Sequence, residues 1–178
     1  MKILFSYPTK LENEVSIINN EMSSGNWDLF HLRKPDWKDD EVERLFSELA
    51  VEVQNKAVVH QSGKQSCHSF EEVDKYEKSV TLSGVEGYCF LSPIFDSISK
   101  KGYKANFEKE ALRAFLKKER KVKVIALGGI TEENYSEVLE LGFDGGAFLG
   151  SVWSKYLCHS ERYFSENLFS SKNDLKNL

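Results

Sequence analysis

Two glycine turns stand out in the segment ALGGITEENYSEVLELGFDGGAFLGSVW. Gly128–Gly129 follow the apolar run Lys123–Leu127, and Leu149–Gly150–Ser151 end the next apolar run, which begins at Asp144. Glycine lets the backbone approach a ligand closely, and the free N–H groups at a helix N-terminus attract an anion. Either turn alone could be an ordinary tight turn. Their tandem arrangement after two neighbouring strands favours a phosphate site.

Histidines lie at the ends of predicted strands. Three of the chain's four histidines, His31, His60 and His68, end or closely follow such a strand. Histidine changes its protonation state near neutral pH, so it suits proton transfer. A single histidine at a strand end is more often structural, but the ligand sites of parallel β/α folds lie at these strand ends. Cys67 precedes His68 on the opposite face of an extended segment, so no Cys–His pair is expected.

Short apolar runs alternate with amphipathic stretches along the chain. This alternation predicts parallel strands joined by crossover helices. About seven strand segments are present, one fewer than a closed barrel uses. The expected fold is α/β, a TIM-type β/α-barrel that is incomplete or distorted, formed by a single domain over residues 1–178. The runs are Lys2–Tyr7, Trp27–Arg33, Lys56–His60, the start of SCHSFEEV (66–73), Gly87–Phe95, Lys123–Leu127 and Asp144–Leu149.

Two predicted helices border the candidate site. Ser69 is the expected N-cap of a helix that continues to about residue 79, with Glu72 at the capping-box position. Thr131 is the expected start of a second helix, which ends at Gly142. Both helices follow strands that carry candidate site residues, so their first turns would face the same edge as those residues.

The composition of the chain argues against several classes of protein. The net charge of −4 argues against a nucleic-acid or anionic-membrane partner. The three cysteines, Cys67, Cys89 and Cys158, form no CxxC pair, so neither a disulfide framework nor a zinc site is indicated. No apolar stretch is long enough for a signal peptide or a membrane span. A cytoplasmic protein without a membrane partner is the expectation.

The connection after His60 is unusually short. Only five residues separate His60 from Ser66, whereas consecutive parallel strands need a crossover of about a dozen residues or more. A bent strand, a hairpin, a remodelled crossover or the loss of one α-β unit would each account for this. A barrel lacking one unit has two unpaired strand edges, which favour association with another copy of the chain. A homo-oligomer is therefore one alternative.

Four motifs, in order, resemble those of the thiamine phosphate synthase/TenI family. FHLRKP (30–35) is similar to the family's QLREK strand, and SCHSFEEV (66–73) to its S-x-H-S-x-E-E junction. FLSPIFDSISK (90–100) is similar to its proline-containing substrate loop. The glycine segment resembles its VxAxGGI motif, followed by an Asn, here Asn134. Another phosphate-binding barrel would explain the glycine turns but neither FHLRKP nor SCHSFEEV.

The resemblance implies a small phosphorylated thiazole or pyrimidine ligand. The implied phosphate-binding residues are Gly128, Gly129, Leu149, Gly150 and Ser151. The further implied substrate contacts are His31, Arg33, Lys34, His60, Ser92, Ser97, Ser99 and Lys100.

The family contains two chemistries. Its synthases join a hydroxymethylpyrimidine diphosphate to thiazole phosphate with Mg²⁺, whereas TenI proteins isomerise a thiazole carboxylate phosphate by proton transfer without a metal. His60–Gln61 stand where the synthases have Asn-Asp, and the segment with their second carboxylate is not found, so Mg²⁺ would lack oxygen ligands. We therefore expect a TenI-like tautomerase with His68 as the proton-transfer residue, and neither a metal site nor another cofactor. A synthase, with Mg²⁺ in that case, and a non-catalytic phosphate-binding or regulatory barrel are the alternatives.

Overall fold

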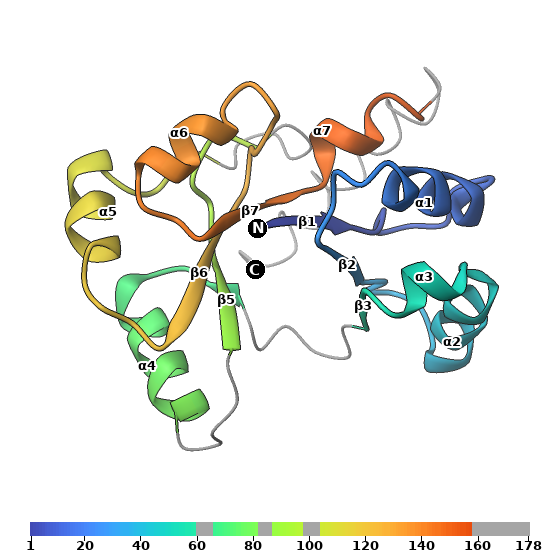
Figure 1. Ribbon diagram of the computed structural model, residues 1–178, viewed down its shortest axis with the longest axis horizontal. Coiled ribbons are helices and arrows are strands. Elements are labelled where there is room, and N and C mark those ends of the chain that lie inside the picture. Colours follow the sequence, from blue (N-terminus) through green and yellow to red (C-terminus); the bar gives the residue numbers. More distant parts are fainter. Residues whose placement is uncertain (60–65, 82–86, 98–103, 158–178) are drawn as a thin grey trace, which may run out of the picture. The chain divides into compact units, whose positions relative to one another are not determined.

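The computed structural model describes residues 1–59, 66–81, 87–97 and 104–157. It consists of two compact units, Met1–Lys64 and Gln65–Leu178. Each unit alternates strands and helices, and its helices lie along its strands (Figure 1). The predicted strand and helix alternation is therefore confirmed in both units. A single domain over the whole chain stays a prediction.

The first unit is a three-stranded parallel arrangement with the order β3-β2-β1. Phe5 on β1 pairs with His31 on β2, and Leu32 on β2 pairs with Val59 on β3. Its elements are β1 (Lys2–Phe5), α1 (Glu14–Ser23), β2 (Leu29–Leu32), α2 (Asp39–Glu48), α3 (Val51–Gln54) and β3 (Ala57–Val59). The strands β1 and β2 end side by side, so the residues after them, including Arg33 and Lys34, share one edge.

The second unit carries four parallel strands in the order β7-β6-β5-β4. Cys67 on β4 pairs with Leu91 on β5, and Leu127 on β6 pairs with Ala147 on β7. Its elements are β4 (Ser66–Cys67), α4 (Phe70–Thr81), β5 (Gly87–Leu91), α5 (Lys109–Leu116), β6 (Val122–Leu127), α6 (Tyr135–Glu140), β7 (Gly145–Phe148) and α7 (Gly150–Trp153). With β1–β3, the described residues form seven strands, as predicted.

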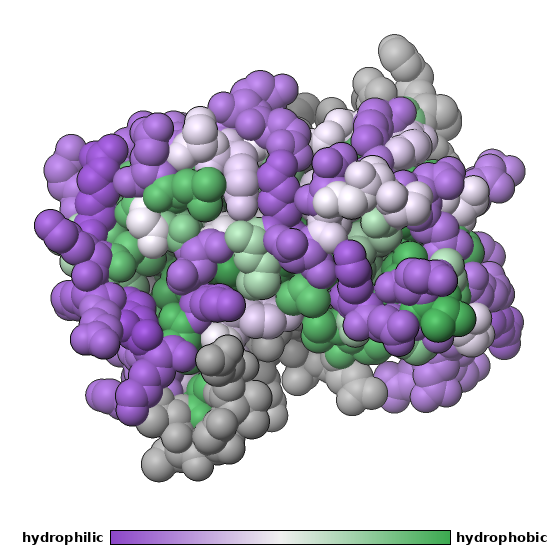
Figure 2. Space-filling model, in the orientation of Figure 1, coloured by the Kyte–Doolittle hydropathy of each residue, from purple (hydrophilic) through white to green (hydrophobic). Residues whose placement is uncertain are grey.

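Apolar residues of the strands supply the core of each unit. Ile3, Leu4 and Phe30 are fully buried in the first unit, and Phe90 and Ile125 in the second. Strands buried in this way are typical of parallel sheets that helices cover. Hydrophilic residues cover most of the described surface in the face that Figure 2 shows. None of the described helices has the length and apolar character needed to cross a lipid bilayer.

The predicted cap of α4 is present in a shifted form. The Ser69 hydroxyl accepts the Glu72 N–H at 3.3 Å, as a capping box requires. The Glu72 carboxylate, however, accepts the N–H of His68 at 2.6 Å, one residue before the N-cap. This return bond ties the backbone of His68 to the first turn of α4.

Candidate functional site

The two glycine turns are neighbours in the second unit. They follow β6 and β7, which pair directly, with Leu127 opposite Ala147. The Ser151 hydroxyl donates to the Ile130 carbonyl at 2.8 Å and so joins the second turn to the first. The prediction that these turns adjoin is therefore confirmed. Their binding of phosphate stays a prediction.

Asn134 shapes the first turn. Its side-chain oxygen accepts the Thr131 N–H at 2.8 Å, and its side-chain amide donates to the Gly129 carbonyl at 2.8 Å. The Thr131 hydroxyl in turn accepts the Asn134 N–H at 3.3 Å, the reciprocal arrangement of a capping box. The regular part of α6 begins at Tyr135, later than the predicted start at Thr131. The first turn is thus braced by side chains and leads through this cap into α6.

A loop after β5 lies directly against Gly129. The N–H groups of Ile94 and Phe95 donate to the Leu127 and Gly128 carbonyls, each at 3.1 Å. A Cβ atom at position 129 would come within 2.3 Å of the Asp96 carbonyl oxygen, and Gly129 has a φ of 67°. Packing alone therefore requires glycine at position 129, so its identity does not by itself indicate a ligand.

The carbonyls and amides of the two turns are used differently. The side chains of Asn134 and Ser151 donate hydrogen bonds to the carbonyls of Gly129 and Ile130, respectively. Within the described residues, no acceptor takes the N–H groups of Gly129, Gly150 or Ser151. Backbone amides without protein partners, placed on two adjoining turns, are suited to an anionic oxygen.

His68 and Ser92, both predicted site residues, are in contact. The His68 ring nitrogen Nδ1 lies 3.1 Å from the Ser92 carbonyl oxygen, and the Ser92 N–H donates to the Cys67 carbonyl at 3.0 Å. A carbonyl only accepts, so Nδ1 carries a hydrogen, and in the neutral ring Nε2 then carries the lone pair. His68 is exposed. The arrangement leaves its Nε2 able to accept a proton from a ligand.

The residue after Ser92 links His68 to the first glycine turn. A Cβ atom at Gly128 would lie 3.0 Å from the Cα atom of Pro93. His68, Ser92, Pro93 and Gly128 therefore follow one another along the edge where β4, β5 and β6 end.

The Cys67 thiol has a different partner from His68. Cys67 and Cys89 are both buried and reduced. A hydrogen bond between their thiols lowers the pKa of Cys67, and the same bond together with burial raises the pKa of Cys89. This contact agrees with the expectation that Cys67 and His68 do not act as a pair.

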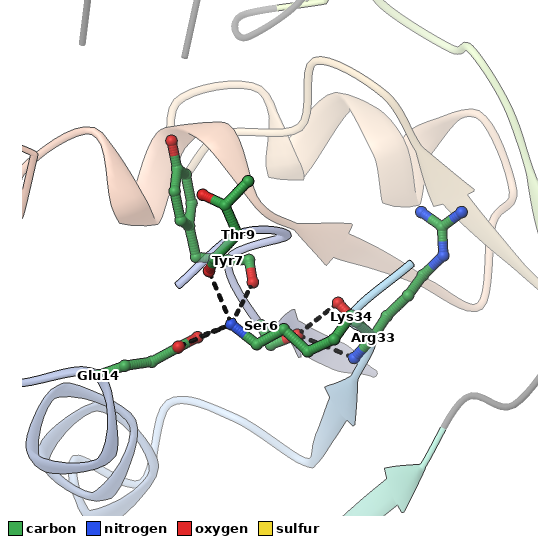
Figure 3. Close-up of polar contacts among 6 residues, drawn as sticks. All are labelled: Ser6, Tyr7, Thr9, Glu14, Arg33 and Lys34. Carbon is green, nitrogen blue, oxygen red and sulfur yellow. Dashed lines mark hydrogen bonds and ion pairs between the residues drawn. The ribbon is translucent and has the colours of Figure 1, made fainter. Parts of the chain in front are cut away.

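In the first unit, Lys34 is buried in a polar cluster that Figure 3 shows. Its amine contacts both carboxylate oxygens of Glu14, at 2.5 and 2.6 Å, and donates to the carbonyls of Tyr7 at 2.7 Å and Thr9 at 2.9 Å. Burial raises the pKa of Glu14 and lowers the pKa of Lys34, while their mutual attraction opposes both shifts. The sequence predicts Lys34 as a substrate contact, but such a contact would have to replace a protein partner.

The other two predicted contacts in FHLRKP, Arg33 and His31, differ from each other in exposure. The side chain of Arg33 is exposed and extends away from Glu14 and Lys34 (Figure 3). His31 is fully buried, with its ring centroid 5.0 Å from that of Phe5. Of the predicted contacts in FHLRKP, Arg33 is therefore the one whose side chain is available at the surface.

The remaining predicted contacts are distributed as follows. Ser97 lies in the described loop after β5 and is partly exposed. His60, Ser99 and Lys100 lie outside the described residues, as does the short connection 60–65.

Sequence reasoning missed Glu14 and Ser6, which hold Lys34 and Arg33 through contacts distant in the sequence. The local signal at this place is Pro8, which follows the end of β1 and cannot donate a backbone hydrogen bond.

A metal ion needs several donor side chains grouped in one place. Among the described residues, no three His, Cys, Asp or Glu side chains are grouped so that they could hold a metal ion. Mg²⁺ prefers several oxygen ligands, normally including a carboxylate. The described residues therefore hold no Mg²⁺ site built from three or more such side chains.

The buried ion pair predicts a large loss of stability when one partner is removed. We expect Lys34→Met to lower the free energy of unfolding by about 3–5 kcal/mol, because it leaves the Glu14 carboxyl buried without its cation. Lys109→Met is the matched control, since Lys109 pairs with Glu137 at the surface, and it should cost less than about 1 kcal/mol. Urea denaturation measures both; equal losses would contradict the structural role of Lys34.

A family model and curated relatives match this chain. The model described as thiamine monophosphate synthase matches residues 64–152, half of the 178-residue chain. The thiamine-phosphate synthase of Anoxybacillus flavithermus is 30% identical over 101 residues, 57% of this chain and 42% of that protein. The thiamine-phosphate synthase of Listeria welshimeri is 31% identical over 108 residues, 56% of this chain and 50% of that protein. The matches thus span half or less of these relatives' length.

Solved structures extend the likeness over nearly the whole chain. A thiamine phosphate pyrophosphorylase from Bacteroides thetaiotaomicron matches with a TM-score of 0.69 and 27% identity, covering 93% of this chain and 91% of that one. The corresponding protein of Pyrococcus furiosus has a TM-score of 0.58 and 20% identity, covering 94% and 92%, which supports the fold alone. The fold is α/β, of the TIM-barrel type, with one described strand fewer than a closed barrel. With its family model matched over half its length, the chain belongs to the thiamine monophosphate synthase (TMP-TENI) family.

Proposed function

We propose that the chain is a thiamine-phosphate synthase, a transferase that joins a pyrimidine diphosphate to a thiazole phosphate. Two findings support the transferase over the tautomerase that the sequence favours. The curated relatives are named thiamine-phosphate synthase, and the structural match at 27% identity is named thiamine phosphate pyrophosphorylase. The observation that carries the ligand assignment is the pair of adjoining turns with unused amides.

The two turns bind the phosphate of the thiazole in this proposal. The amides of Gly129, Gly150 and Ser151 donate to its oxygens, while Asn134 and Ser151 keep the first turn rigid through its carbonyls. Rigid donors need no rearrangement when the anion binds, which favours both affinity and a fixed ligand orientation. The thiazole ring is thereby held for attack on the pyrimidine carbon.

Departure of the diphosphate requires positive charge. Mg²⁺, when bound, would supply such charge in this family. Among the predicted substrate contacts that the structure describes, Arg33 is the one with an exposed cationic side chain at a strand end. A guanidinium offers paired N–H groups that match phosphate oxygens, so Arg33 is assigned to the diphosphate.

A TenI-like tautomerase is the second candidate, and the geometry of His68 favours it. The Ser92 carbonyl fixes the proton on Nδ1 and leaves Nε2 as the base. Such a base could move a proton on a thiazole carboxylate phosphate without any metal. In the synthase, the same histidine would contact the ligand without needing to exchange a proton.

A coupling assay separates the candidates. We expect thiamine phosphate to form from the pyrimidine diphosphate and thiazole phosphate in the presence of Mg²⁺, measured by chromatography of the product. His68→Ala should keep most of this activity, because the proposed transfer assigns it no proton step. Formation of no product, together with tautomerisation that His68→Ala abolishes, would instead support the second candidate. Ligand binding without either reaction would support a non-catalytic barrel.

Loss of the Asn134 side chain should weaken phosphate binding. We expect Asn134→Ala to lower the affinity for thiazole phosphate about tenfold, because two hydrogen bonds that fix the Gly129–Thr131 turn are lost. Asn20→Ala, at an exposed position of α1, is the control and should leave affinity unchanged. Calorimetric titration provides the measurement. Unchanged affinity in Asn134→Ala would remove this turn from the proposed site.

A further inference from the structure

One serine side chain binds both backbone polar groups of Arg33. The Ser6 hydroxyl accepts the Arg33 N–H at 2.8 Å and donates to the Arg33 carbonyl at 2.9 Å (Figure 3). Ser6 lies directly after β1 and is 2% exposed. Two bonds to one residue restrict its backbone more than a single contact does, so the hydroxyl fixes how residue 33 leaves β2.

The hydroxyl acts where the regular ladder between β1 and β2 stops. The Ser6 N–H donates to the His31 carbonyl at 2.9 Å, in register with the Phe5–His31 pair. A continued parallel ladder would next bind Arg33 through the Ser6 carbonyl and the N–H of residue 8. Residue 8 is proline and has no N–H. The Ser6 hydroxyl therefore takes both of these ladder bonds, one of which, to the Arg33 carbonyl, the proline at position 8 prevents.

The residue after Arg33 is fixed as well. The Lys34 amine is held by Glu14 and by the carbonyls of Tyr7 and Thr9, which belong to the chain after β1. Arg33 thus stands between two restrained points, Leu32 on β2 and buried Lys34. Within the described residues its guanidinium has no hydrogen-bond or ion-pair partner. A restrained backbone with an unpaired, exposed cation is suited to recognising an anion.

We propose that Ser6 is a positioning residue that aims the Arg33 guanidinium at the diphosphate group of the substrate. The inference rests on the proposed function for the assignment of Arg33 to the diphosphate. Ser6 itself touches no substrate. Its hydroxyl fixes the backbone from which the guanidinium extends, so less side-chain and backbone freedom is lost when the anion binds.

Inorganic pyrophosphate is the probe, titrated calorimetrically into the full chain. We expect Arg33→Ala to weaken its binding by about tenfold or more, because a charge-assisted contact is lost. Ser6→Ala should weaken it about three- to tenfold. In the Ser6→Ala/Arg33→Ala double variant the affinity should equal that of Arg33→Ala, since Ser6 acts only through Arg33. Ser6→Thr, which keeps the hydroxyl, should bind close to the wild-type level.

Ser47→Ala is the matched control. Its hydroxyl also bonds a backbone carbonyl, that of Arg44 at 2.7 Å, but lies on the exposed surface of α2. This variant should bind pyrophosphate as the wild type does. If Ser6→Ala does not fold, Ser6→Cys keeps the size of the side chain and weakens both hydrogen bonds. Wild-type affinity in a folded Ser6→Ala or Ser6→Cys variant would overturn the proposal, as would additive losses in the double variant.

Hydrogen exchange separates this inference from the proposed function. The Arg33 amide should exchange faster in Ser6→Ala than in the wild type, because its acceptor is removed, while the Val124 amide, bound to Asp144, should not change. An unchanged exchange rate of the Arg33 amide in Ser6→Ala would overturn the positioning role of Ser6, whichever ligand Arg33 binds. A second outcome is that exchange is faster in Ser6→Ala but Arg33→Ala binds pyrophosphate as the wild type does. That outcome would reject the assignment of Arg33 to the diphosphate, and therefore also the proposal that Ser6 aims Arg33 at this group.

Discussion

The close approach of the β5 loop to the Gly128–Gly129 turn is the constraint on which the candidate site depends. The Asp96 carbonyl occupies the space that a side chain at position 129 would need, and positive φ values at both glycines complete the requirement. The loop and the side chains of Asn134 and Ser151 use the carbonyls of this segment. Among the described residues, the amides of Gly129, Gly150 and Ser151 remain without an acceptor and can meet an anion. Protein packing thus builds the turn, and its unused amide suits it to binding an anion.

The two adjacent cations of the first unit divide structural and ligand roles between them. Lys34 is enclosed by Glu14 and two carbonyls, so its charge is used within the fold. Arg33, one residue earlier, has its backbone held by Ser6 and its side chain exposed. Alternation along an extended chain explains why neighbours face different surroundings. In sequence the two residues look interchangeable, and only their partners distinguish them.

Much of the fold could be predicted because the apolar runs, and the amphipathic stretches between them, are local signals of strands and helices in a parallel sheet. Strand ends placed the Gly128–Gly129 and Gly150–Ser151 turns on neighbouring strands, which the β6–β7 pairing confirms. The regular part of α6 begins at Tyr135 rather than at the predicted Thr131, because Thr131 and Asn134 first exchange side-chain hydrogen bonds in a capping turn. The partners of Lys34 could not be predicted, because Glu14 lies on another element and nothing local indicates the contact. The role of Ser6 becomes visible only when the register of β1 and β2 is known.

The central claim is that the amides of the two glycine turns bind the phosphate of a thiazole ligand. Nuclear magnetic resonance titration of the isotopically labelled chain with thiazole phosphate tests it most directly. The account predicts saturable shifts of the Gly129, Gly150 and Ser151 amide signals, with inorganic phosphate competing for the same signals. Saturable binding that leaves these three amides unperturbed and shifts other signals would contradict it.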